Sequence, residues 1–98
     1  MIYCFDLDNT LCSSVGNDYS IAEPFKNRIL KVNRLYDQGH TIIIDSARGT
    51  LSKKDLFELT QEQLKSWGVK YHYLRTGVKF FADHYVDDKA INDIIFFK

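Results

Sequence analysis

Little in this sequence marks a specialised class of protein. Its 98 residues include one proline and two cysteines, and thirteen basic residues balance thirteen acidic ones. So few cysteines cannot build the disulfide framework of a small secreted domain. A net charge of zero provides no basic surface for a nucleic acid or an anionic membrane. No apolar run reaches bilayer-spanning length, and the N-terminus has no signal-peptide pattern. We therefore expect a soluble, cytoplasmic protein that binds neither nucleic acid nor membrane.

The apolar residues that are present indicate one packed domain, covering residues 1–98. Hydrophobic residues make up 45% of the chain. Three stretches have the apolar or alternating pattern of strands, at 1–7, 41–45 and 69–74. Two stretches have apolar residues at helical spacing, at 24–38 and 52–67, the second being one helix or two helices with a break near Thr60. Ser52 is expected to cap the second helix, and Gly39 and Gly68 to end the two.

A further short strand is expected at 84–86, whereas the apolar tail at 91–97 fits either a helix or a strand. Alternation of strands and helices predicts an α/β fold, a three-layer Rossmann-like parallel sheet with helices on both faces. The apolar centre of 41–45 agrees with a strand covered on both sides. In such a sheet the ligand binds beyond the carboxyl ends of the strands.

Polar side chains follow the predicted strands at this edge. The groups are Asp6 and Asp8 after the first strand, Asp45, Ser46 and Arg48 after the second, and Asp87 and Asp88 after the fourth, which Lys79 precedes. Clustered carboxylates repel one another unless a cation lies between them, and Mg²⁺ prefers oxygen ligands of this kind. A cation, a lysine and a hydroxyl together suit a phosphoryl group. Of two adjacent carboxylates, one can attack as a nucleophile while the other carries a proton.

The motif Asp6-Leu7-Asp8-Asn9-Thr10 resembles the DxDxT signature of the haloacid dehalogenase (HAD) superfamily. Ser46, Lys79 and the pair Asp87-Asp88 follow in the order of the other three motifs of that superfamily. The stretch from SARG to KFFADHYVDDKAI is similar to a small capless subgroup, often described as capsule or polysaccharide biosynthesis phosphatases. Phe80 departs from that subgroup, which often has proline after the lysine. The resemblance implies a HAD-like fold without a cap domain.

The resemblance also implies a role for each motif residue. Asp6 would be the nucleophile and a Mg²⁺ ligand, and Asp8 would be the acid and base whose backbone carbonyl also binds Mg²⁺. Lys79 would orient Asp6. The residues expected to support or bind the phosphoryl group are Asn9, Thr10 and Ser46. The remaining metal ligands would be Asp87 directly and Asp88 through water. The implied activity is a Mg²⁺-dependent phosphomonoester hydrolase with an aspartyl-phosphate intermediate, acting on a phosphorylated small molecule of carbohydrate or capsule biosynthesis.

Several alternatives remain open at this point. Arg48 either binds a second anionic group of the substrate or pairs with Asp45 or Asp83. Cys4 is expected in the core, and Cys12 has no assigned role. Receiver-like phosphoacceptors and non-catalytic phosphate-binding modules use similar residues, although receivers place the lysine last. Because no cap covers the site and the apolar tail needs burial, a homo-oligomer is expected.

Overall fold

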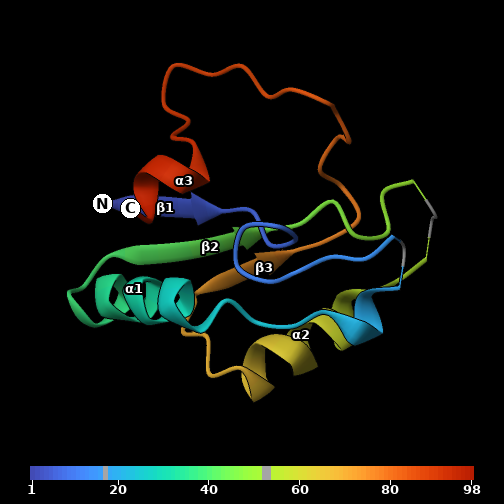
Figure 1. Cartoon of the computed structure of the whole chain (residues 1–98), viewed down its shortest axis with the longest axis horizontal. Coiled ribbons are helices and arrows are strands. Elements are labelled where there is room, and N and C mark those ends of the chain that lie inside the picture. Colours follow the sequence, from blue (N-terminus) through green and yellow to red (C-terminus); the bar gives the residue numbers. More distant parts are fainter. Residues whose placement is uncertain (17, 52–53) are drawn as a thin grey trace.

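The computed structural model describes residues 1–16, 18–51 and 54–98, so the cap expected at Ser52 lies outside the described residues. The described residues form three strands, three α-helices and one 3₁₀ helix, η1, and Figure 1 shows how the strands and α-helices are arranged. Their bounds in chain order are β1 (Ile2–Phe5), η1 (Tyr19–Ile21), α1 (Lys26–Asp37), β2 (Thr41–Asp45), α2 (Phe57–Ser66), β3 (Tyr73–Arg75) and α3 (Asp93–Phe96). In the described residues, no helix is long and apolar enough to cross a membrane.

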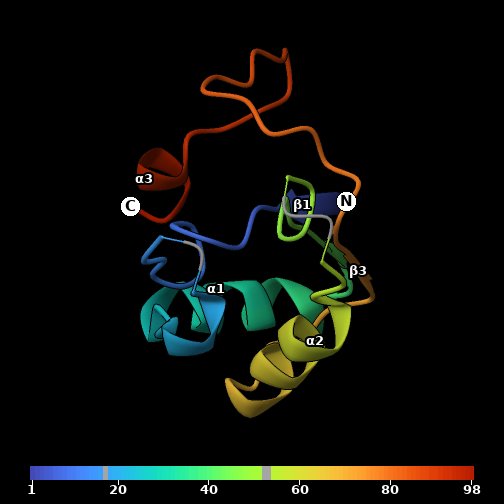
Figure 2. The same cartoon turned by 90° about the vertical axis from the view of Figure 1, so that its right-hand side faces the viewer.

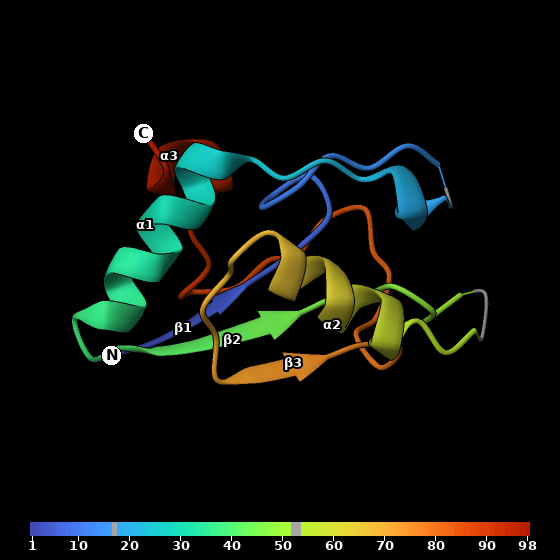
Figure 3. The same cartoon turned by 90° about the horizontal axis from the view of Figure 1, so that it is seen from below.

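The three strands form one parallel sheet in the order β1-β2-β3, which confirms the parallel α/β class. Tyr3 pairs with Ile42 and Ile44 pairs with Leu74. Each connection between neighbouring strands contains one α-helix, α1 and then α2. Parallel crossovers are right-handed, so two successive steps in the same direction place both helices on one face. Figures 1 and 3 show α1 and α2 on that common face.

The expectation of helices on both faces is therefore not met. Phe5, Ile42 and Ile44 point toward α1 and α2 and are buried. On the opposite face Ile2 is 72% exposed, and Cys4 is exposed as well, so the prediction that Cys4 lies in the core is wrong. A doubly wound sheet needs a strand on the far side of β1, where the direction of winding reverses. The described residues place no strand there.

Helix α1 begins later than its sequence pattern suggested. Pro24 was expected at the first helical position, but it forms an isolated bridge with Cys12, and the helix starts at Lys26. The amide of Phe25 donates to the carbonyl of Leu11 at 2.8 Å, which holds the entry to the helix against the loop after β1. The helix ends as expected before Gly39, whose φ of 93° suits glycine.

Helix α2 is continuous through Thr60, which settles the choice between one helix and two. The Thr60 hydroxyl donates to the carbonyl of Leu56 at 2.7 Å, so this buried polar group is satisfied inside the helix. Strand β3 spans Tyr73–Arg75, whereas the alternating pattern had suggested 69–74. Val69 is instead buried in the turn that leads from the helix to the strand.

The last quarter of the chain differs most from expectation. The predicted strand at 84–86 is absent, and every residue from 80 to 92 is exposed. Figures 1 and 2 show this segment leaving the carboxyl end of β3 and arching away from the sheet before it returns to α3. The tail forms the short helix α3, which begins after the cap Asn92. The ring of Phe96 packs on Phe5 with centroids 5.6 Å apart, beside the outer edge of β1.

Candidate functional site

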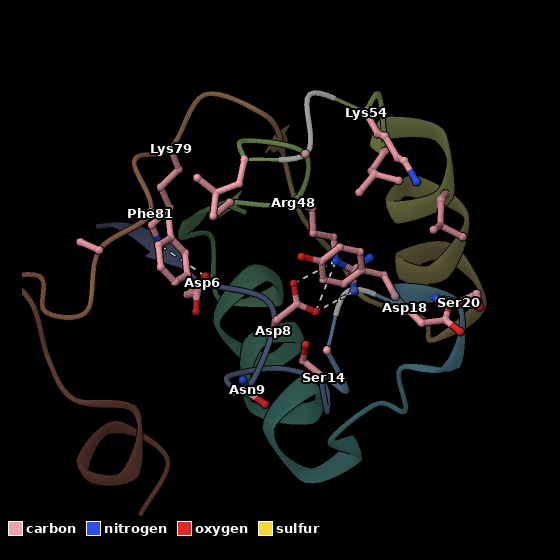
Figure 4. Close-up of a pocket in the computed structure, with 18 of the residues that line it drawn as sticks. Asp6, Asp8, Asn9, Ser14, Asp18, Ser20, Arg48, Lys54, Lys79 and Phe81 are labelled. Carbon is pink, nitrogen blue, oxygen red and sulfur yellow. Dashed lines mark hydrogen bonds and ion pairs between the residues drawn. The ribbon is translucent and has the colours of Figure 1, made fainter.

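A pocket of about 720 Å³ lies at the carboxyl ends of the strands, where the sequence placed the site (Figure 4). Five of the predicted site residues line it, namely Asp6, Asp8, Asn9, Arg48 and Lys79. The loop after β1, the loop after β2 and the segment after β3 all contribute to the wall. The edge rule for parallel sheets therefore located the pocket correctly.

The loop after β1 is a tight coil built around one carbonyl group. The Leu7 oxygen accepts from the amides of Thr10 at 3.1 Å and Leu11 at 2.8 Å. Asn9 has a φ of 64°, a left-handed conformation that glycine and asparagine adopt most readily. The coil brings Thr10 back beside Asp6 and leaves both aspartates at the pocket.

Asp6 is the accessible carboxylate of the site. Its side chain is 44% exposed, and Lys79 Nζ lies 3.3 Å from its Oδ1. The Thr10 hydroxyl donates to its Oδ2 at 3.3 Å. Lys79 also lies over the ring of Tyr85, 4.8 Å from the centroid, which restrains the ammonium group. One oxygen thus faces a cation and the other a hydroxyl, and the carboxylate remains open to the pocket.

Asp8 is held quite differently, by a buried guanidinium group (Figure 4). Arg48 Nη2 donates to Asp8 Oδ1 at 2.8 Å, and Nε donates to Oδ2 at 3.0 Å. The Arg48 side chain is 0% exposed and that of Asp8 is 19% exposed. Two parallel N–H bonds fix the plane of a carboxylate as well as its position. Asp8 is therefore rigidly oriented, whereas Asp6 is the more exposed of the two.

Arg48 forms neither of the ion pairs that the sequence suggested. The guanidinium group contacts neither Asp45 nor Asp83, and its contact with a second anionic group of a substrate stays a prediction. It is enclosed by side chains that the sequence pattern did not indicate, namely Thr60 at 3.2 Å, Gln63 at 2.5 Å and the ring of Tyr19 at 4.6 Å from its centroid. The only sequence signal was a threonine on the apolar face of α2. Arg48 thus positions Asp8.

Ser46 lies at the end of β2 but faces inward. It is buried, and its hydroxyl accepts from the amide of Arg48 at 3.1 Å. A hydroxyl that accepts one bond still has its own proton to donate. Ser46 does not belong to the pocket wall, and its predicted contact with a phosphoryl group stays a prediction.

The structure does not bring Asp87 and Asp88 to the other site residues. Both lie in the exposed segment after Lys79 and outside the pocket wall. Asp87 accepts from the amide of Lys89 at 2.7 Å, and this bond lowers the pKa of its carboxyl. Among residues 1–16, 18–51 and 54–98, no three His, Cys, Asp or Glu side chains gather as metal ligands. The expected four-carboxylate site is thus incomplete within one chain.

Cys12 sits beneath the site without serving as a ligand. Burial, and next the charge of Asp8, raise the pKa of its thiol to about 12, so it stays protonated at neutral pH. The thiol donates to Asp8 Oδ1 at a sulfur–oxygen distance of 3.5 Å. A buried neutral thiol is a weak donor and a poor nucleophile. Cys12 therefore supports Asp8.

Comparison with known proteins identifies a shared fold. No protein-family profile and no curated protein matches the chain. A crystal structure of a structural-genomics target from Vibrio cholerae is similar, with a TM-score of 0.87 and 23% sequence identity. The match covers 98% of this chain and 86% of the Vibrio chain. The two chains therefore share the parallel α/β architecture described above.

Proposed function

We propose that this protein is a phosphomonoester hydrolase that uses Mg²⁺ and forms an aspartyl-phosphate on Asp6. The observation that supports it most is the pair of unequal carboxylates at the end of β1. Asp6 is accessible beside Lys79, and Asp8 is fixed by Arg48. An exposed carboxylate and an oriented neighbour are suited to nucleophilic attack and to proton transfer respectively.

The first step forms one bond and breaks one bond. An oxygen of Asp6 attacks the phosphorus atom, the phosphorus–oxygen bond of the ester breaks, and Asp8 gives its proton to the leaving oxygen. Water then attacks the phosphorus atom, Asp8 takes a proton from it, and Asp6 and inorganic phosphate are released. Asp8 Oδ2 accepts one bond from Arg48, at 3.0 Å, and keeps a lone pair for this proton. Lys79 would balance the charge on Asp6 and on the phosphoryl oxygens.

The oxygen atoms at the end of β1 are of the type that Mg²⁺ prefers as ligands. Mg²⁺ binds through one or two carboxylates and completes its shell with water and substrate phosphate. The Asp6 carboxylate and the main-chain carbonyl of Asp8 are hard oxygen donors, whereas the Asp8 carboxylate is committed to Arg48. A bound Mg²⁺ would neutralise charge that develops on the phosphoryl group.

The experiment is an assay of the purified chain with an aryl phosphate and a panel of sugar, amino-alcohol and nucleoside phosphates, with and without Mg²⁺. Activity that needs Mg²⁺ and falls at least about 10³-fold in Asp6→Asn is expected, since the nucleophile is lost. Asp37→Asn is the matched control, because Asp37 lies on α1 and pairs with Lys70 at the surface. Full activity in Asp6→Asn, or none in the wild type, would refute the proposal. Preference for sugar phosphates would support a role in carbohydrate or capsule biosynthesis.

The separation of Asp87 and Asp88 from Asp6 favours a second candidate, a phosphate-binding or phosphoacceptor module without turnover. Such a module would bind a phosphate analogue at Lys79 and Asp6, or would accept a phosphoryl group from acetyl phosphate and retain it. Stable labelling of Asp6 by mass spectrometry, with no phosphate released in the assay, would distinguish it from the hydrolase.

A further inference from the structure

Strand β1 and residues 80–92 both leave groups exposed that are usually paired or buried. β1 is an edge strand, and among the described residues no strand pairs with its outer side. Residues 80–92 are exposed without interruption, and Val86 reaches 98%. An open edge presents unpaired amide and carbonyl groups that another strand can bind. An exposed run of large apolar side chains on a small domain calls for burial.

The two parts match each other in pattern. Residues 84–88, with the sequence HYVDD and here named the acidic segment, combine aromatic and β-branched residues with acids at the carboxyl end, as β1 does. In a parallel pairing that places Val86 beside Phe5, the apolar side chain of Val86 joins the covered face of the sheet. The same register sets two more pairs, Tyr85 with Cys4 and Asp87 with Asp6.

The course of the chain points to a second copy as the partner of β1. Both ends of the exposed stretch are fastened to their own body, where Thr50 Oγ1 donates to the Lys79 carbonyl at 2.8 Å and Arg28 pairs with Asp93 at 2.7 Å. Between these points the chain turns away from its own β1, as Figures 1 and 2 show. The match to the Vibrio cholerae structure covers 98% of the chain, which includes this stretch.

We propose that two copies of this chain exchange their acidic segments, so that each segment adds as a parallel strand to β1 of the other copy. One symmetric exchange pairs both open edges and brings both Val86 side chains to covered sheet faces without moving either body. Asp87 of the partner subunit then lies beside Asp6 and adds the carboxylate that one chain lacks. The role of Asp87 at the site rests on the proposed function, whereas the strand pairing does not.

A cross-linking experiment tests the pairing directly. Cys4 is exposed on β1, and Cys12 is buried, so Tyr85→Cys creates one new accessible partner for Cys4. Mild oxidation is expected to give a disulfide-linked dimer, mapped by mass spectrometry to Cys4 and position 85 and lost in Cys4→Ser/Tyr85→Cys. Glu62→Cys, exposed on α2, reports random collision. An intramolecular disulfide in a monomer, or equal cross-linking of the Glu62 variant, would overturn the proposal.

The molecular mass in solution provides a second measurement. The wild type is expected to be a dimer by light scattering at micromolar concentration. Val86→Pro removes an amide from the added strand and is expected to be a monomer of half that mass, whereas Val86→Thr stays dimeric. Val86 is almost fully exposed within one chain, so neither substitution disturbs the body. A monomeric wild type, or a fully dimeric proline variant, would contradict the exchange.

Mixing two inactive variants links the exchange to the site. Asp6→Asn and Asp87→Asn each lose activity alone. In a mixed dimer, one of the two sites combines an intact Asp6 with an intact Asp87 of the partner subunit. Unfolding and refolding an equal mixture is expected to restore about a quarter of wild-type activity, since half of the dimers are mixed. If activity does not recover but the Cys4 cross-link forms, only the catalytic role of Asp87 is refuted. If activity does not recover and the cross-link does not form, the exchange itself is refuted.

Discussion

At the scale of single residues, the contact between Arg48 and Asp8 is the main determinant of the site. A guanidinium group at 0% exposure holds a carboxylate at 19% exposure through two nearly parallel bonds. Removing one member of a buried ion pair leaves the other charge without compensation, and this costs more than the pair itself contributes. Lys70 pairs with Asp37 at the surface, where the two side chains are 49% and 58% exposed. The two ion pairs therefore allow a buried pair to be compared with an exposed one.

Arg48→Met is expected to lower the free energy of unfolding by about 3 kcal/mol, because it strands the carboxylate of Asp8 and the side chain of Gln63. Lys70→Met is expected to cost less than about 1 kcal/mol, since exposed pairs contribute little. Urea denaturation monitored by circular dichroism measures both values. Equal losses in the two variants would show that burial does not strengthen the Arg48 pair.

Residue types predicted the open half of the site better than its buried half. Asp6, Asp8, Asn9 and Lys79 were found from one motif and from the rule that ligands bind at the carboxyl ends of strands. The partners of Arg48 come from α2 and η1, and only folding brings these elements together. Sequence patterns describe which face of an element is apolar, and they do not encode which polar side chains meet across two elements.

At the scale of secondary-structure elements, α3 shows how a short helix is stabilised by contacts rather than by its own propensity. One turn of helix is unstable alone, because nucleation costs more than so few hydrogen bonds return. Phe96 packs on Phe5, and Lys31 Nζ lies 4.2 Å from the centroid of its ring. Ile94 on the same helix is 70% exposed. Contacts with β1 and α1 thus stabilise a helix that is too short to form alone.

Phe96→Ala is expected to lower the free energy of unfolding by about 2 kcal/mol, because it removes a half-buried aromatic ring from the edge of the core. Ile94→Ala is expected to change it by less than about 0.5 kcal/mol, since that side chain is exposed. Guanidinium denaturation followed by tryptophan fluorescence compares them. If both variants unfold at the same concentration, the contact with Phe5 contributes nothing.

Elements with strong periodicity were predicted well, and elements that depend on their neighbours were not. The apolar spacing around Ile29 and Val32 predicted α1 to within two residues of its observed start. The run at 41–45 is β2, but Ile43 is only half-buried because both helices lie on the other face. Residues 84–86 were expected to be a short strand and yet form none in one chain. A strand forms only when another strand pairs with it, and the local sequence pattern does not show whether such a partner is present.

At the scale of the whole molecule, the described part of one chain leaves an edge strand, a sheet face and an extended segment uncovered. Small domains bury a modest fraction of their surface and have little stability in reserve. If two copies exchange segments, folding and association become one equilibrium, and stability then depends on protein concentration.

The thermal midpoint of the wild type is therefore expected to rise by several degrees between about 1 and 100 μM, and that of Val86→Pro to stay constant. Calorimetry at a series of concentrations measures both. A wild-type midpoint that does not depend on concentration would show that the single chain carries all of the stability. The fold class and the position of the pocket were predictable from the chain alone, whereas this dependence belongs to the assembly.

The burial of Arg48 also constrains how the sequence of this protein can evolve. The same guanidinium group orients a reactive carboxylate and fills the space between the loop after β2 and helix α2. Any replacement of Arg48 that changes the orientation of Asp8 therefore also changes the packing of the interior. A change in that packing would in turn change the orientation of Asp8. We expect drift at position 48 to be accompanied by changes at its contact positions, which are 8, 19, 60 and 63. Residues of the site and residues of the core would therefore change together during evolution.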